Sequence, residues 1–152
     1  MKKENERMKK YNVWKLVPKK KVEKEVPNVQ SLMSTWAFKK KSNGNLRGRL
    51  NAHGFKPKEG VHYKKNNISS PVTNEVTIRV VLVLILVMQL LAGVLDVKGA
   101  FLQGEFDDDE EQIYMTVPNG MEEYYGQDML LKLLAPIYGL RNASMAFYKK
   151  LK

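Results

Sequence analysis

A run of apolar residues occupies positions 80–95, interrupted only by Gln89 and Gly93 and followed directly by Asp96. The run falls short of the roughly 20 residues that a membrane-spanning helix needs, so burial in a protein core is favoured over a membrane span. We predict a buried helix that Gly93 ends, followed by a short buried strand at 94–97. A membrane-associated segment built on the run is the alternative. The candidate N-cap residues of the helix are Thr73, Asn74 and Glu75.

Charge is divided unequally along the chain. The net charge is +14 over residues 1–65 and −4 over residues 66–152, which gives +10 in total. A basic half suits a polyanion such as nucleic acid, and an acidic half suits metal cations or simple solvation. Two ordinarily solvated surfaces fit the same totals, so charge alone leaves both interpretations open. The lack of cysteine excludes a disulfide framework and a Cys-ligated zinc site.

The clearest local pattern is a hairpin with a cationic face. Residues 36–41 form an aromatic and lysine-rich strand, residues 42–45 contain an Asn-Gly turn, and residues 46–52 alternate leucine with arginine. We predict that the exposed face of this hairpin carries its cations, which makes it suited to phosphate groups.

The remaining pattern predicts further helices, strands and loops. Residues 2–24 are rich in lysine, and a helix or an extended lead-in is expected there that ends at Pro18. A secretory signal peptide is not expected, because no apolar core follows the charged start. The other expected elements are a loop at 56–71, a tight turn into a short helix at 98–104, an acidic loop at 105–111, strands at 113–118 and 130–134, and a helix at 142–152.

Asp96 is the strongest single candidate for a chemical role. A carboxylate at the end of an apolar strand, followed by the small residues Gly99 and Ala100 and the aromatic Phe101, is what a polymerase uses to hold Mg²⁺ against a nucleoside triphosphate. If Asp96 lies in a buried strand, its charge needs a partner, because burying an unpaired charge is costly. On this pattern alone, an N-cap or a salt-bridged aspartate is the better explanation of a lone carboxylate.

The order of segments is more specific than any of them alone. The chain resembles the reverse transcriptase domain of copia-type retrotransposon polyproteins. The matching segments, in family order from residue 14 to about 148, are Trp14-Lys15-Leu16-Val17-Pro18, Trp36-Ala37-Phe38-Lys39, Gly44 through Arg49-Leu50-Asn51-Ala52 and Gly54-Phe55, Gly60-Val61-His62-Tyr63, Ser70-Pro71-Val72, Thr77-Ile78-Arg79, the run from Leu95 to Gly104, Ile113-Tyr114-Met115 with Pro118 and Gly120, and Ile137-Tyr138-Gly139-Leu140.

This resemblance implies an α+β fold, namely the fingers and a partial palm of a right-hand polymerase. A basic lead-in would occupy residues 1–13, the fingers about 14–92 and the start of the palm about 93–152. The implied partners are an RNA template, a DNA primer and dNTP, together with the rest of a retrotransposon polyprotein. The family also implies a cytoplasmic virus-like particle as the location.

The resemblance also implies roles for individual residues. Asp96 would be the first catalytic carboxylate and would bind Mg²⁺ beside the backbone of Val97. Phe101 would exclude a ribose 2′-OH and so favour deoxynucleotides. The residues expected to contact the dNTP are Lys40, Arg47 or Arg49, Gly99, Ala100, Phe101 and Asn142.

The implied reaction is in-line attack of a primer 3′-OH on the α-phosphate, assisted by two Mg²⁺ ions. The family takes its other carboxylates from a Tyr-x-Asp-Asp hairpin, which is absent from these 152 residues, and Asp107-Asp108-Asp109 fits a solvated turn better. The family's usual Gln is replaced by Asn142, and an Arg common in the family is replaced by His53. We therefore expect a decayed polymerase fragment that is inactive alone.

A non-catalytic, basic nucleic-acid-binding module is the competing hypothesis. Phosphate contacts of such a module weaken with salt whatever the nucleotide, whereas a palm site responds to Mg²⁺ and dNTP. For a partial palm we also expect marginal stability and aggregation, because sheet edges and apolar surface stay uncovered.

Overall fold

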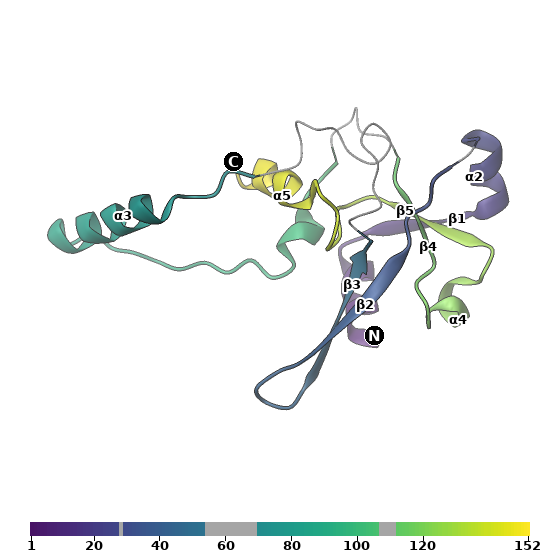
Figure 1. The fold of residues 1–152 in the computed structure, drawn as a ribbon, viewed down its shortest axis with the longest axis horizontal. Coiled ribbons are helices and arrows are strands. Elements are labelled where there is room, and N and C mark those ends of the chain that lie inside the picture. Colours follow the sequence, from purple (N-terminus) through teal and green to yellow (C-terminus); the bar gives the residue numbers. More distant parts are fainter. Residues whose placement is uncertain (28, 54–69, 107–111) are drawn as a thin grey trace.

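The structure of the chain is a computed structural model that describes residues 1–27, 29–53, 70–106 and 112–152. It contains helices and antiparallel strands, which confirms the mixed composition predicted from the sequence (Figure 1). The elements are α1 (Lys2–Lys10), β1 (Trp14–Pro18), α2 (Lys19–Glu25), β2 (Ser34–Lys40), β3 (Leu46–Ala52), α3 (Glu75–Val87), the 3₁₀ helix η2 (Ala100–Gln103), β4 (Tyr114–Thr116), α4 (Glu122–Tyr125), β5 (Met129–Leu133) and α5 (Ala143–Leu151).

Three strands form an antiparallel sheet in the order β1-β5-β4 and contribute buried residues to the main core. In the central strand, Leu131 is opposite Leu16 of β1 and Met115 of β4, and its side chain is fully buried. The strands predicted at 113–118 and 130–134 are confirmed, although β4 is shorter than expected. Because β5 has a partner on both sides, its apolar residues have the neighbours that burial requires.

The N-terminal prediction is wrong in its detail. Pro18 does not end a helix or lead-in running from residue 2: helix α1 ends at Lys10, and Pro18 is the last residue of strand β1. A proline fits there because β1 is an edge strand, where a missing backbone donor costs little. Pro18 also stands at the N-cap of α2, a helix the sequence did not predict.

The β2–β3 hairpin is confirmed and extends away from the sheet (Figure 1). Its strands pair antiparallel, and Phe38 lies opposite Gly48. A Cβ at Gly48 would lie only 3.1 Å from Cε1 of Phe38, so the missing side chain leaves room for the ring. At the tip, the Lys41 N–H donates to the Asn45 carbonyl oxygen, and Gly44 adopts a φ of +79° that favours glycine.

The base of the hairpin is attached to the rest of the molecule at two points. The Ala52 N–H donates to the carbonyl oxygen of Tyr138 over 2.7 Å, and the Trp36 indole donates to the carbonyl oxygen of Asn119 over 3.0 Å. The main core lies between the sheet, the hairpin base, α1 and α5, and its buried residues are Met8, Val13, Leu32, Leu50, Ala52, Leu102, Ile113, Met115, Leu131, Leu133, Ile137, Leu140 and Ala143.

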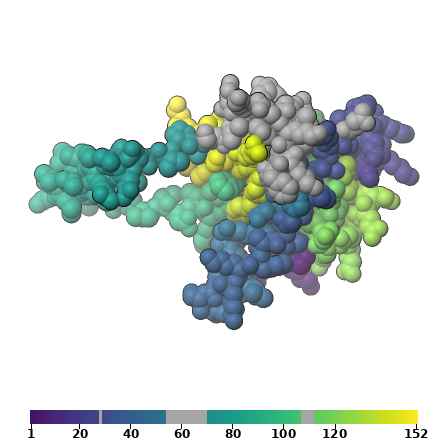
Figure 2. Space-filling model, viewed as in Figure 1, coloured from purple at the N-terminus to yellow at the C-terminus, as the bar shows by residue number. Residues whose placement is uncertain are grey.

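Helix α3 begins where the sequence predicts and then departs from the prediction. The Asn74 side chain accepts a hydrogen bond from the Val76 N–H over 2.8 Å, so Asn74 is the N-cap. The helix ends at Val87, before Gly93, and none of its residues is buried. Figures 1 and 2 show it projecting from the rest of the molecule. Among the described residues, no helix is long and apolar enough to cross a membrane.

The buried strand expected at 94–97 is also wrong. These residues have no regular secondary structure, and Val94 and Leu95 are almost fully exposed. A strand needs a neighbour for its N–H and C=O groups, and no described strand pairs with this segment. Asp96 is therefore exposed, so the argument from a costly buried charge does not apply to it.

The expected elements after Asp96 are largely present. Lys98 and Gly99 turn into η2, and the final helix is observed as α5. The short helix α4 was not predicted. Residues 54–69 and 107–111 hold most of the loops expected at 56–71 and 105–111, and those parts lie outside the described residues.

Candidate nucleotide-binding cavity

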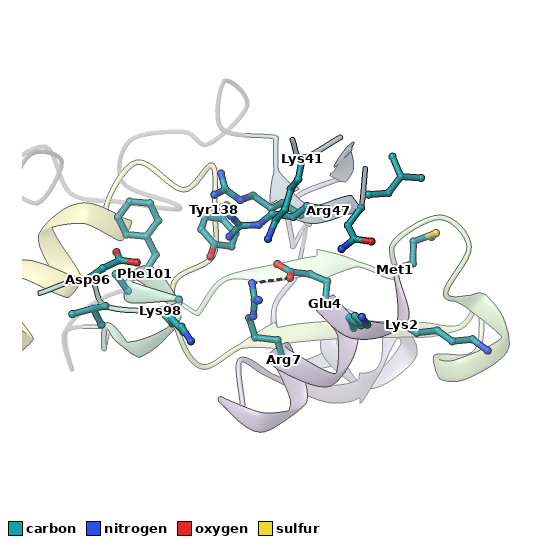
Figure 3. Close-up of a pocket in the computed structure, with 18 residues that line it drawn as sticks. Met1, Lys2, Glu4, Arg7, Lys41, Arg47, Asp96, Lys98, Phe101 and Tyr138 are labelled. Carbon is teal, nitrogen blue, oxygen red and sulfur yellow. Dashed lines mark hydrogen bonds and ion pairs between the residues drawn. The ribbon is translucent and has the colours of Figure 1, made fainter. Parts of the chain in front are cut away.

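A cavity of about 970 Å³ lies between α1, the β2–β3 hairpin and the segment that carries Asp96 (Figure 3). We call it the basic cavity. Its walls come from residues 1–4 and 7 of the α1 region, residues 41 and 45–49 of the hairpin, residues 96–101, and Tyr138. These four segments are far apart in the sequence, so only the fold brings them together.

Seven of the nine site residues implied by the family resemblance line the basic cavity: Asp96, Val97, Gly99, Ala100, Phe101, Arg47 and Arg49. The other two are not among the lining residues. Lys40 is exposed at the end of β2, and its neighbour Lys41 lines the cavity instead. Asn142 is buried at the N-cap of α5.

The turn after Asp96 is held by side chains from two directions. Gly99 has a φ of +67°, in the left-handed region that favours glycine, and leads directly into η2. The carbonyl oxygen of Lys98 accepts hydrogen bonds from the Tyr11 hydroxyl over 3.2 Å and from Gln103 Nε2 over 3.1 Å. Leu102, which follows this turn in η2, is buried in the main core. The backbone at Gly99 is therefore fixed relative to α1 and the sheet.

Tyr138 connects the hairpin wall to the Asp96 wall. Its ring packs edge-on against Phe101 at a centroid distance of 5.8 Å, and the Arg49 guanidinium lies 5.3 Å from its centroid. The backbone of Tyr138 also accepts the hydrogen bond from Ala52 at the hairpin base. Tyr138 thus positions both Arg49 and Phe101.

The cavity is strongly cationic. Two carboxylates, Glu4 and Asp96, line it, against seven cations: Lys2, Lys3, Arg7, Lys41, Arg47, Arg49 and Lys98. Arginine and lysine are the side chains that bind phosphate groups, arginine through its bidentate fork. Burial raises the pKa of the Glu4 carboxyl, and Arg7, Arg47 and Arg49 nearby oppose that rise. The arrangement is complementary to a polyanion.

The residues described do not make a two-metal centre. Mg²⁺ prefers oxygen ligands, and the resemblance implies a pair of ions held by several carboxylates. Asp96 and the backbone of Val97 supply too few oxygens for that, and the described ranges contain no group of three histidine, aspartate or glutamate residues that could hold a metal. Asp107, Asp108 and Asp109 lie outside the described residues. We therefore derive no reaction step through Mg²⁺.

Sequence reasoning missed four side chains that shape the cavity. Glu4, Arg7 and Tyr11 lie in the segment expected to be a mere lead-in, and Tyr138 was noted only as part of a family motif. Their contacts join residues up to 90 positions apart, such as Tyr11 with Lys98. No local pattern signals such a contact.

Comparison with known proteins identifies the family of this chain. The chain matches the family model for reverse transcriptase (RNA-dependent DNA polymerase) over residues 11–152, and it therefore belongs to that family. The resemblance identified from the sequence is confirmed.

The relatives come from plant transposons. The chain is 35% identical over 156 residues to the retrovirus-related Pol polyprotein from transposon TNT 1-94 of Nicotiana tabacum, covering 99% of this chain and 11% of the relative. It is 34% and 33% identical over 146 residues to the corresponding polyproteins from transposons RE2 and RE1 of Arabidopsis thaliana, covering 93% of this chain and 9% of each relative. The chain thus spans about a tenth of these relatives. No solved structure matches it significantly.

Proposed function

We propose that this chain forms the fingers and the start of the palm of a retrotransposon reverse transcriptase, and that the basic cavity holds the triphosphate of an incoming dNTP. The observation that carries this proposal is the convergence of seven family-matched residues on one cationic cavity. The fingers would comprise about residues 14–92 and the palm about residues 93–152. The partners would be an RNA template and a DNA primer.

The roles of the lining residues follow from their chemistry and position. Arg47 and Arg49 would bind the phosphates, and the backbone at Gly99 and Ala100 would lie close to the triphosphate because neither residue has a bulky side chain. Phe101, held edge-on against Tyr138, would occupy the space that a ribose 2′-OH needs. Asp96 would contribute the first carboxylate and, with Val97, the first contacts to Mg²⁺.

The reaction of the whole polymerase would be attack of a primer 3′-OH on the α-phosphate, with pyrophosphate as the leaving group. This chain's own contribution would be to bind and orient the triphosphate. The 152 residues contain no Tyr-x-Asp-Asp motif. We therefore expect no primer extension from this chain by itself.

A direct test compares dTTP and UTP binding to the wild type and to charge-matched variants. Arg47→Gln removes a cation from the cavity, and we expect a loss of dTTP affinity of about tenfold. Lys15→Gln removes an equal charge from the exposed face of β1 and should change the affinity less than about twofold. Lys40, outside the cavity, should fall between the two. Equal losses from Arg47→Gln and Lys15→Gln would show that dTTP responds only to overall charge.

Phe101→Ala tests the sugar contact in the same experiment. We expect the preference for dTTP over UTP to disappear, because the ring that excludes the 2′-OH is gone. Asp96→Asn should remove any effect of Mg²⁺ on dTTP affinity while leaving salt-sensitive RNA binding unchanged.

A second function is favoured by the charge of +14 over residues 1–65 and by the exposed lysines of the hairpin. A non-catalytic nucleic-acid-binding module would bind RNA with an affinity that falls steeply with salt. In that case dTTP would not compete with RNA, and neither Mg²⁺ nor Asp96→Asn would alter the binding.

A further inference from the structure

Helix α1, all of which precedes the residues matched to the family model, is a fixed wall of the basic cavity. Met8 is buried in the main core, and the side chain of Asn5 is hydrogen-bonded to the hydroxyl of Tyr125. The Val13 N–H, just after the helix, donates to the Met8 carbonyl oxygen. These contacts hold the first turn of α1, which carries Glu4, in a defined place.

Glu4 is the most unusual group in this wall, because it is a buried carboxylate in a cavity built for anions. Only 5% of its side chain is exposed, and its Oε2 pairs with Arg7 Nη1 at 3.0 Å. Its Oε1 is buried and has no hydrogen-bond partner in the part of the chain that is described. Figure 3 shows the carboxylate pointing away from α1, toward the wall that carries Arg47 and Tyr138.

The position of Glu4 places it in competition with any phosphate that enters. A phosphate group and the Glu4 carboxylate are attracted to the same guanidinium groups, those of Arg7, Arg47 and Arg49. Two like charges a few ångströms apart repel strongly where water is partly excluded. The ligand must therefore displace the carboxylate, tolerate it or cause its protonation.

We propose that Glu4 is an internal counter-ion of the basic cavity, which weakens the binding of phosphate groups there and couples that binding to proton uptake. This inference rests on the proposed function, because it assumes that the cavity takes a polyphosphate. The raised pKa of Glu4, caused chiefly by burial, agrees with a group that accepts a proton readily once a further anion is near.

The test measures the binding of inorganic triphosphate and dTTP to the full chain by titration calorimetry. Glu4→Gln keeps the shape of the side chain and its ability to accept from Arg7, and we expect both probes to bind about tenfold tighter. Glu6→Gln is the matched control, since Glu6 is exposed on the same helix, and should change affinity less than about twofold. Affinity that is unchanged or weaker in Glu4→Gln would overturn the inference.

The two proposals fail in different ways. If the wild type and Glu4→Gln bind triphosphate equally, and Arg47→Gln weakens both, then the cavity binds polyphosphate and only the role of Glu4 is wrong. If Glu4→Gln tightens inorganic triphosphate but neither protein prefers dTTP to UTP, Glu4 is a counter-ion and the nucleotide assignment is wrong. No binding by either protein overturns both.

A second measurement does not depend on comparing affinities at one pH. Trimetaphosphate keeps a constant charge between pH 5 and pH 8, and its affinity for the wild type should rise as the pH falls, whereas Glu4→Gln should show a flatter response. The groups that face Glu4 are Arg7 and the α-amino group of Met1 on its own segment, and Arg47 and Arg49 on β3. Asp96 lines the same cavity, so Asp96→Asn made in both backgrounds separates its contribution. Parallel pH responses in wild type and Glu4→Gln would overturn the coupling.

Discussion

The three-stranded sheet and the arm, which we define as residues 74–95, contain similar apolar residues. The sheet buries them, whereas the arm exposes them to solvent. Leu131 in β5 is completely buried, whereas Leu91 and Val94 in the arm are completely exposed. The difference lies in the neighbours, because β5 pairs with β1 and β4 while no residue of α3 is buried. Burying a leucine contributes about 1.5–3 kcal/mol, but only if other elements cover it. An apolar run therefore shows that burial would be favourable, but it does not show which other element, if any, covers the run.

The largest expected effect comes from matched truncations in the two regions. Leu131→Ala should lower the free energy of unfolding by about 2–5 kcal/mol, because it leaves a cavity between three strands. Leu91→Ala removes the same atoms from a fully exposed site and should change it by less than about 0.5 kcal/mol. Urea unfolding followed by circular dichroism measures both. A large cost at Leu91 would show that the arm packs against something in solution.

The next comparison uses one substitution at two glycines. Gly139 has a φ of +89°, and a Cβ there would lie 2.3 Å from the carbonyl oxygen of Ala52, so the hairpin base would have to move. Gly139→Ala should cost about 2–3 kcal/mol of stability. A Cβ at Gly93, in the arm, would meet nothing within 4 Å, and Gly93→Ala should be neutral or slightly stabilising. Thermal unfolding distinguishes the two, and equal shifts would contradict the contrast.

Local signals explain most of the elements that were predicted correctly. The hairpin follows from alternation around an Asn-Gly turn, and the start of α3 follows from Asn74, whose side chain acts within two residues. The lysines around strand β1 leave its pattern open between a helix and an extended lead-in up to Pro18, so the sequence does not predict a separate strand there. The exposure of α3 and the absence of a strand at 94–97 depend on which elements are available to pair, and no local pattern contains that information.

The candidate site divides in the same way. The prediction that Asp96, Arg47, Arg49 and Phe101 are site residues came from the resemblance, and all four line one cavity in the structure. The position of Glu4 could not be anticipated, because it depends on α1 docking beside strand β3, more than 40 residues later in the chain. Lys40 likewise lies outside the cavity, and its neighbour Lys41 lines the cavity instead.

The smallest expected effect is on the pH dependence of stability. We expect Glu4, beside the cavity, to contribute to it, and Glu75, in the arm, to contribute almost nothing. Burial raises the pKa of Glu4 above its usual value of 4.5, so the folded protein holds this proton more tightly than the unfolded chain does. The resulting stabilisation is fully present below about pH 4.5 and is lost as the pH rises through the folded-state pKa. At pH 7 the ionised carboxylate is then a net cost, and Glu4→Gln should raise the melting temperature slightly there while matching the wild type at pH 4.

Glu75→Gln removes an exposed carboxylate that pairs with Arg79 in the arm, and such a pair contributes little, so the melting temperature should move by less than about one degree. If Glu4→Gln instead lowers the melting temperature at pH 7, the pair with Arg7 outweighs the cost of burial, and Glu4 stabilises the cavity wall.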